Sequence, residues 1–166
     1  MGIPSQATYQ TMILTEAEKG YLAGLFDGEG CIGYYCRYTK RIPYHSASLH
    51  ICMTDRRAPE WILNKVGYGH ISFCKKSGNR RSVYSWQLCN KPQIQEILRA
   101  IRPYLMVKAD QVDLLFTLWK AEEAFPVRTI SSDLVKLRQI TMDQISYLKK
   151  AVVEGVETRR AEPFMG

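Results

Sequence analysis

Residues 21–30 read YLAGLFDGEG, and this segment restricts the possible folds of the chain more than any other. Apolar residues at helical spacing surround the small residues Ala23 and Gly24, and the run ends in Asp27 and Glu29, two carboxylates separated by a glycine. The C-terminal end of a helix carries partial negative charge, so acidic side chains there are unfavourable unless a cation offsets them. We therefore expect a helix whose C-terminal end binds a hard divalent cation.

The rest of the chain is basic, which sets this acidic helix end apart. Its 166 residues include 23 Lys and Arg against 16 Asp and Glu, a formal net charge of +7, and a symmetric dimer would carry twice that charge. Such a charge attracts phosphate backbones. Charge alone also fits a basic protein without a polyanion partner, but together with the acidic helix end it favours a metal site in a polyanion-binding protein.

The bulk composition narrows the class of protein further. Five cysteines lie in strand-like segments without a CxxC pair, which favours reduced thiols over disulfides or a zinc knuckle. No apolar run approaches the roughly 20 residues of a membrane span, and residues 1–11 lack the pattern of a secretory signal. We expect an intracellular protein without a membrane partner. It should form one domain over residues 15–154, with an N-terminal extension (1–14) and a charged tail (155–166).

Local signals give the order of the elements. Thr15 and Glu18 predict a capping box for a helix that begins at Glu16 and that Gly28 should end. Alternation with a period of two predicts strands over residues 31–38, 45–53, 70–76 and 80–89, the last two joined by a turn at 77–79. Helical spacing predicts helices over residues 59–66, 91–101, 110–123, 133–140 and 143–154.

The strand pattern also assigns side chains to the two faces of a sheet. Ala47, Leu49, Ile51 and Met53 alternate with polar or small residues and should face the core. The same alternation predicts that eight further residues face the core, namely Ile32, Tyr34, Cys36, Ile71, Phe73, Tyr84, Trp86 and Leu88. The expected fold class is therefore α+β, with an antiparallel sheet that helices cover on one face and leave open on the other.

Residues 21–30 resemble the LAGLIDADG motif of homing endonucleases. Six residues match the motif as they stand, namely Leu22, Ala23, Gly24, Leu25, Asp27 and Gly30. Three differ, since Phe26, Gly28 and Glu29 replace Ile, Ala and Asp. The αββαββα succession over residues 15–125 is also that of the family, and the resemblance implies its saddle-shaped antiparallel sheet with helices on one face.

The single copy of the motif predicts a homodimer. A glycine inside a helix costs about 1 kcal/mol relative to alanine, and close approach of a partner helix is the expected compensation. Since the motif occurs once, that partner helix should come from a second copy of the chain. The residues expected at this dimer interface are Tyr21, Ala23, Gly24 and Asp27.

The resemblance also implies an activity. The expected reaction is metal-dependent hydrolysis of phosphodiester bonds, which makes a double-strand break in a long pseudo-palindromic site of double-stranded DNA. Glu29, the second motif carboxylate, and the carbonyl of Gly28 are the expected metal ligands, with Asp27 tying the helix ends together. Mg²⁺ is the expected ion, with Mn²⁺ or Ca²⁺ able to substitute and Ca²⁺ giving no turnover.

Two further catalytic residues follow from the family pattern. Lys108 matches the family's basic residue before a later helix, which polarises water or stabilises the transition state. Asp55 lies after the second strand, where the family often has a polar residue that contacts the water network. The chain has Pro59 where some relatives have Arg, and it stays open whether Arg56 or Arg57 fills that role or whether both contact phosphates.

The open face of the sheet is the expected DNA-binding surface, because a two-stranded ribbon fits the major groove of B-DNA. Hydrogen-bonding side chains lie along this face, and basic side chains lie near the hairpin tips. The residues expected to contact DNA are Tyr35, Arg37, Lys40, Arg41, Ser46, Ser48, His50, Arg56, Arg57, His70, Ser72, Lys75, Lys76, Arg80, Arg81, Ser85 and Gln87.

Two alternative functions use the same scaffold and do not depend on DNA cleavage. An intron maturase would bind intron RNA and help it fold, alone or in addition to cutting DNA, and would not need the carboxylate of Glu29. A DNA-binding regulator is the third hypothesis, but such proteins usually carry an additional helix-turn-helix domain, for which residues 15–154 leave no room. Retention of Glu29 and Lys108 favours the nuclease.

Overall fold

The computed structural model describes residues 12–39, 42–75, 78, 81–125 and 131–154. Its elements are α1 (Glu16–Glu29), β1 (Gly30–Thr39), β2 (Ile42–Met53), α2 (Arg57–Val66), β3 (His70–Cys74), β4 (Val83–Leu88), α3 (Lys91–Ile101), the short 3-10 helix η1 (Arg102–Tyr104), α4 (Ala109–Glu122) and α5 (Ser132–Glu154). The order from α1 to α3 is the αββαββα succession expected from the sequence. No helix in the described part of the chain is both long and apolar enough to cross a membrane.

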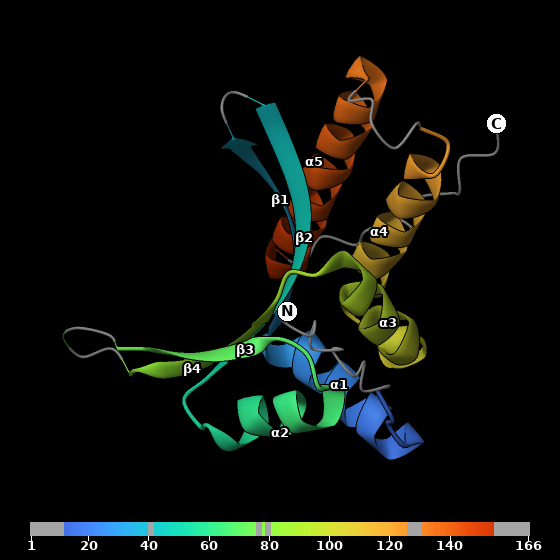
Figure 1. The fold of residues 1–166 in the computed structure, drawn as a ribbon. Helices are drawn as coiled ribbons and strands as arrows, with labels where there is room; N and C mark the ends of the chain where they lie inside the picture. Colours follow the sequence, from blue (N-terminus) through green and yellow to red (C-terminus); the bar gives the residue numbers. More distant parts are fainter. Residues whose placement is uncertain (1–11, 40–41, 76–77, 79–80, 126–130, 155–166) are drawn as a thin grey trace, which may run out of the picture.

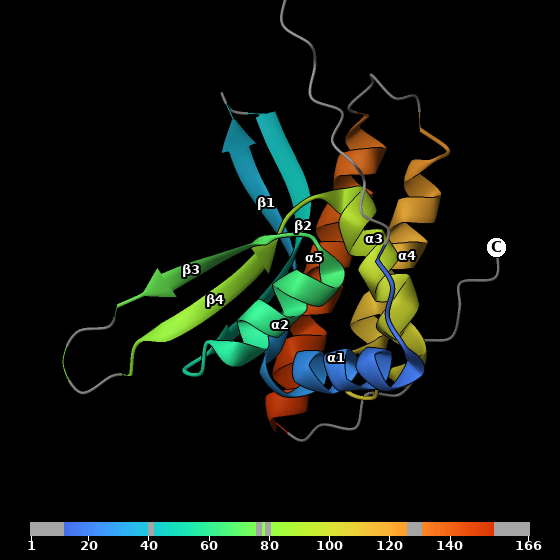
Figure 2. The ribbon, with the colours of Figure 1, turned by 60° about the horizontal axis from the view of Figure 1, so that its bottom comes forward.

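One antiparallel sheet organises the molecule. Its strand order is β1-β2-β4-β3, so the second strand of each hairpin lies in the centre. Ile32 pairs with Leu49, and Ile51 pairs with Trp86, which places these large apolar residues on the same face. The two hairpins splay apart, and the helices gather on the side that these residues face (Figures 1 and 2). The expected α+β fold with one covered sheet face is confirmed.

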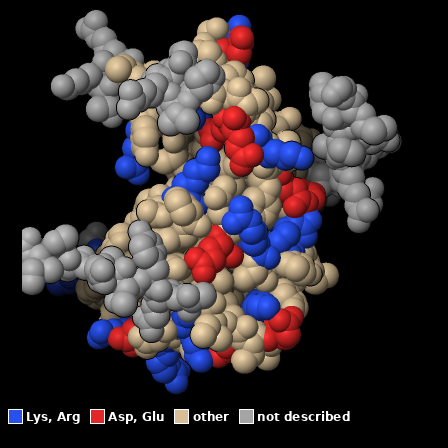
Figure 3. All heavy atoms as spheres, turned by 45° about the vertical axis from the view of Figure 1, so that its right-hand side comes forward, with Lys and Arg blue, Asp and Glu red and all other residues tan. Residues whose placement is uncertain are grey.

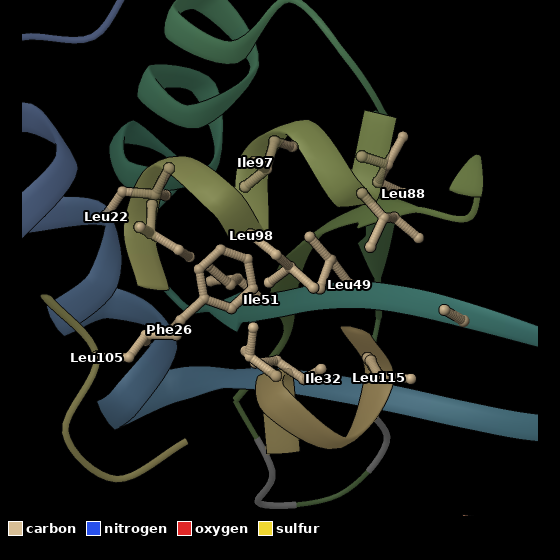
Figure 4. Packing of buried hydrophobic residues seen from close by; sticks show 14 of the residues in the cluster. Leu22, Phe26, Ile32, Leu49, Ile51, Leu88, Ile97, Leu98, Leu105 and Leu115 are labelled. Atoms are coloured by element: carbon tan, nitrogen blue, oxygen red, sulfur yellow. The ribbon is translucent and has the colours of Figure 1, made fainter. Parts of the chain in front are cut away.

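The core lies between α1, α3, α4 and the covered face of the sheet. Phe26 of α1 is fully buried, lies close to Ile51, Leu98 and Leu105 (Figure 4), and meets Trp86 edge to face with 6.3 Å between ring centroids. Burial of each large side chain of this kind stabilises the fold by about 1.5–3 kcal/mol. The packing fixes the position of α1 relative to the sheet, and with it the position of the acidic helix end.

Helix α1 begins at the expected residue but ends one residue later than expected, at Glu29. Thr15 and Glu18 form both hydrogen bonds of the capping box. The helix continues through Gly28 to Glu29, and Gly30 is its C-cap. A Cβ atom at Gly30 would lie 2.5–2.8 Å from atoms of Phe26, so only glycine fits where the helix turns directly into β1. The prediction that Gly28 ends the helix was wrong, because close packing limits the helix at residue 30.

The C-terminal helices differ from the sequence prediction in one respect. Residues 132–154 form the single helix α5 and not two helices over 133–140 and 143–154. Neither Gly nor Pro separates the two segments, and the hydroxyl of Thr141 bonds the carbonyl oxygen of Leu137 within the helix. Helix α5 packs against α4 and β1, so it lies beside the edge strand of the sheet.

Two residues and one strand boundary differ from the sequence prediction. Ala23, expected at a dimer interface, has no exposed surface and belongs to the core of the protomer. Phe73, expected in the core, is 56% exposed because β3 extends past the helices, and it packs on the half-buried Tyr84. The strand expected over residues 80–89 begins only at Val83. The expected turn at 77–79 falls mostly outside the described residues.

Candidate active site at the end of the first helix

Asp27 joins the end of α1 to the segment before α4. Its carboxylate accepts hydrogen bonds from the backbone N–H groups of Met106, at 2.8 Å, and of Lys108, at 2.9 Å. Its carbonyl oxygen accepts a third, at 2.6 Å, from the Lys108 ammonium group. The geometry fits the expected tying role of Asp27, because both carboxylate oxygens and the carbonyl oxygen already have partners.

Glu29 has the opposite environment. It is the last residue of α1, it is exposed, and no hydrogen bond or ion pair joins its carboxylate to the described residues. The last turn of the helix contains no basic residue that would offset the helix dipole. The Gly28 beside it is also exposed. The helix therefore presents one unpaired carboxylate, next to an exposed glycine, at its negative end.

Lys108 lies beside these groups as the N-cap residue of α4. Burial lowers the pKa of its ammonium group, and this effect outweighs the neighbouring acids Asp27 and Glu29, which raise it. The positive charge of Lys149 lowers the Lys108 pKa further. Glu29 and Lys108, which are 79 positions apart in the sequence, thus interact electrostatically in the folded chain.

The third expected catalytic residue, Asp55, has a partner elsewhere. It lies in the loop between β2 and α2, where the Arg57 guanidinium binds both carboxylate oxygens at 2.5–3.0 Å. These hydrogen bonds lower the pKa of Asp55 to about 2. No contact joins Asp55 to Glu29 or Lys108, so its catalytic role stays a prediction that requires release from Arg57. Arg56 is paired too, with Glu60 at 2.6 Å, and lies over the Tyr84 ring.

A single protomer offers few metal ligands. Among the described residues, no three His, Cys, Asp or Glu side chains converge to hold an ion. The available donors are the free carboxylate of Glu29 and the backbone carbonyl of Gly28, both oxygen donors. Mg²⁺ prefers oxygen and keeps several waters, so one or two protein ligands per protomer fit it. The donor set does not fit zinc, which favours nitrogen and sulfur.

The open face of the sheet carries the polar side chains that the strand alternation predicted. The register sets Arg37, Ser46, His50 and Gln87 on the face opposite the core residues, together with His70 and Ser72. The four strands contain neither Asp nor Glu. The side of the molecule nearest α3 and α4 differs, since basic and acidic side chains alternate there (Figure 3). The open face is therefore free of strand carboxylates that would repel a polyanion.

The expected accessibility of this face was partly wrong. Ser48 and Ser85 point outward but are only 8% and 5% exposed, because short side chains in the two central strands are screened by larger neighbours. Arg81 and Lys75 are exposed near the second hairpin tip. Four of the expected hairpin-tip contacts lie outside the described residues, namely Lys40, Arg41, Lys76 and Arg80.

Sequence reasoning missed a group of residues on the β1 side of the site. The Tyr35 ring lies over Gly33 and places its hydroxyl 3.7 Å from the Cys31 sulfur. Burial, together with this contact, raises the pKa of Tyr35 to about 12. The ammonium group of Lys149, from α5, lies 3.5 Å from the same sulfur. The spacing of residues along α5 gave no signal for this contact, which depends on how α5 crosses β1.

The expected dimer-interface residues divide into two groups. Gly24 is exposed, and a Cβ atom there would meet nothing within 4 Å, so one side of α1 remains uncovered in the protomer. Tyr21 is half-exposed and packs edge to face on Trp61. Ala23 is fully buried in its own chain, and the half-buried Asp27 uses its carboxylate for hydrogen bonds within the protomer. The uncovered side of α1 therefore includes fewer of these residues than the sequence predicted.

Comparisons with known proteins agree on the fold. A scan against protein-family profiles gives no match, and a search of curated protein sequences gives none. Solved structures do match. The homing endonuclease I-CvuI, in complex with its target in the presence of Ca, is 18% identical over 80% of this chain and 82% of that chain, with a TM-score of 0.65. The archaeal intron-encoded homing endonuclease I-Vdi141I, complexed with DNA, is 13% identical over 90% of this chain and 89% of that chain, also with a TM-score of 0.65.

A third match covers only part of the related protein. The LAGLIDADG meganuclease I-AabMI, bound to uncleaved DNA, is 20% identical over 87% of this chain but over only 52% of its own, with a TM-score of 0.59. The chain has the fold of the LAGLIDADG homing endonucleases. It spans most of I-CvuI but about half of I-AabMI. At these identities the likeness establishes the LAGLIDADG fold, and the chemistry has to be argued from the site.

Proposed function

We propose that this chain is a homodimeric, site-specific DNA endonuclease that hydrolyses one phosphodiester bond in each strand of a long, pseudo-palindromic site. The observation that carries the proposal is the contrast at the end of α1. Glu29 is exposed without a partner among the described residues, while Asp27 near it accepts three hydrogen bonds, two of which come from Lys108 and hold it in place. A carboxylate kept free at a helix end next to a fixed lysine fits catalysis better than structural support.

Each residue of the site has a distinct role in this proposal. Glu29, with the Gly28 carbonyl, would hold a divalent cation, for which Mg²⁺ is the natural candidate. When bound, such an ion neutralises phosphate charge and activates water. Lys108 would stabilise charge at the scissile phosphate, because its ammonium group is fixed by the Asp27 carbonyl and has donors to spare. Asp27 would position Lys108 without touching the substrate.

The open sheet face is the proposed DNA-binding surface. Its hairpins carry Arg37, His50 and Gln87, which can bond base edges, and Lys75 and Arg81, which can bond phosphates. The two protomers would meet through the uncovered side of α1 near Gly24.

An intron maturase is the second candidate. One observation favours it, because Tyr35 and Tyr44 are 43% and 61% exposed on the open face. Exposed aromatic rings stack on unpaired bases, which is how many proteins bind single-stranded RNA. This activity would not require Glu29, so a substitution of Glu29 should distinguish the two functions.

The test selects cleaved sequences from a library of randomised DNA duplexes with Mg²⁺, then compares variants on the selected site. Glu29→Gln should bind this duplex normally but cut it about a thousandfold more slowly. Glu123→Gln makes the same chemical change at another exposed helix end and should cut like the wild type. Equal cutting by Glu29→Gln and the wild type would refute the assignment. Tight binding to a structured intron RNA with no DNA cleavage would favour the maturase.

A further inference from the structure

Helix α5 reaches the candidate active site with its C-terminal end. It packs against α4 and runs in the opposite direction (Figures 1 and 2), so the end of α5 lies near the beginning of α4, where Lys108 is the N-cap. Figures 1 and 2 show the two helices side by side, with the end of α5 near the end of α1. This arrangement brings residues near position 149 to the starting point of β1.

Lys149 is the residue that makes contact there. Its ammonium group lies 3.5 Å from the Cys31 sulfur and 5.8 Å from the centre of the Tyr35 ring. Both side chains belong to the open face of β1, and Cys31 is only two residues from Glu29. The ammonium group therefore reaches the open face from the edge of the sheet. The ring and sulfur contacts of the ammonium group restrain a flexible side chain.

The charges around this position are unbalanced. No carboxylate among the described residues forms an ion pair with Lys149, and Lys108 binds a neutral carbonyl oxygen. The charge of Lys149 is close enough to lower the pKa of Lys108. The two ammonium groups therefore repel each other, and an anion bound between them would relieve this repulsion. The exposed carboxylate of Glu29 offers one charge, and it is itself the proposed ligand of a cation.

We propose that Lys149 binds a backbone phosphate of the nucleic acid next to the scissile bond, and so positions the substrate over Glu29. This inference rests on the proposed function. Phosphate fits because two lysines with free donors converge beside a site for hydrolysis of phosphodiester bonds. Lys149 contacts the substrate but not the reacting bond, so it sets affinity and alignment. It adds a residue from α5, outside the αββαββα core, to a site otherwise built from α1 and the segment before α4.

The experiment measures binding of the selected duplex over a series of salt concentrations, with Ca²⁺ to limit turnover. Lys149→Met keeps an apolar stem on Tyr35 but removes the charge. It should reduce the slope of log affinity against log salt by about 1 for each protomer. Lys150→Met removes an identical charge from the next, exposed position of the same helix and should leave the slope unchanged. Lys149→Arg should restore most of the slope.

The outcomes separate this inference from the proposed function. Thermal unfolding of Lys149→Met, measured alongside, identifies a loss that comes only from instability. Equal slopes for the Lys149→Met and Lys150→Met variants, with cleavage intact, would overturn the role of Lys149 and leave the endonuclease standing. If the wild type neither binds nor cuts any duplex, the proposed function fails, and the role of Lys149 fails with it.

Discussion

The two faces of the sheet differ in what they contribute to the molecule. The covered face is apolar and closed, and Ile51 and Trp86 on it have no exposed surface. The open face is polar, lacks acidic residues and shows exposed rings such as Tyr44. Helix α1 belongs to both regions, since Phe26 enters the core and Glu29 ends in solvent. Stability should therefore depend on the covered side and activity on the open side. Substitutions on one side should have little effect on the property that the other side determines.

The largest loss of stability is expected from the covered side. Phe26→Ala should reduce the free energy of unfolding by about 3–5 kcal/mol, because it leaves a cavity against Trp86 and Ile51. Tyr44→Ala, on the open side, should change it by less than about 0.5 kcal/mol. Urea unfolding of both variants measures the difference. Losses of similar size would contradict the division between the two faces.

Asp27 should show an intermediate effect, because it connects the two sides. Asp27→Ala leaves the N–H groups of Met106 and Lys108 without their charged acceptor, and about 2 kcal/mol of unfolding free energy should be lost. Asp55→Ala removes an exposed, solvent-screened pair with Arg57 and should cost much less. A loss for Asp27→Ala no greater than that for Asp55→Ala would mean that the carboxylate does not tie the two segments together.

Acid should weaken the covered side through Glu122. Burial raises the pKa of Glu122, but hydrogen bonds from Lys91 and Arg138, both at 2.7 Å, outweigh burial and lower it overall. A lowered pKa in the folded state means stability that is present above the ordinary pKa of glutamate and lost as the pH falls through the lowered value. The difference in unfolding free energy between wild type and Glu122→Gln should therefore be larger at neutral than at acidic pH.

A second titration in the same cluster defines the control for that measurement. Burial, aided by Arg138, lowers the pKa of His45, whose ring stacks on Tyr34. Protonation of His45 in acid also favours the unfolded state, so the wild-type profile contains both effects. Since Glu122 also raises the pKa of His45, the comparison with Glu122→Gln is repeated in a His45→Phe background to isolate the glutamate. A difference independent of pH would mean that Glu122 is not stabilised as an anion.

The smallest effect on stability is expected at Glu29. Glu29→Gln removes a charge that the helix dipole disfavours, so the free energy of unfolding should stay within about 0.5 kcal/mol of the wild type or rise slightly. Activity should fall to background in the same variant. Chemical denaturation and cleavage of the selected duplex, measured on one preparation, check both. A destabilised Glu29→Gln variant would mean that Glu29 has a structural role and not a catalytic one.

The sequence predicted the covered side better than the open side, for physical reasons. Apolar alternation is a local signal, so the inward direction of Leu49, Ile51 and Trp86 could be predicted and is confirmed. Accessibility is set by neighbours across strands, and this is why the burial of Ser85 was missed. The continuity of α5 was missed because Thr141 and Met142 looked like a boundary but do not break a helix.

The candidate site was predicted in part. The convergence of Glu29 with Lys108 followed from the resemblance to a known motif, and the three bonds of Asp27 gave it a geometric basis. Lys149 could not be predicted, because its position depends on how α5 crosses β1 and not on any pattern in its own segment. Ala23 was misplaced because a small residue in a helix fits a core as well as an interface.

The most direct test of the account uses a dimer with one wild-type protomer and one Glu29→Gln protomer, purified through different affinity tags. Each protomer is proposed to supply one carboxylate for one strand, so this mixed dimer should convert a supercoiled plasmid with the selected site to nicked circles. Linear plasmid formed at the rate of the wild-type dimer would contradict the account, because one Glu29 would then serve both strands or neither. Plasmid left fully supercoiled would contradict the independence of the two sites.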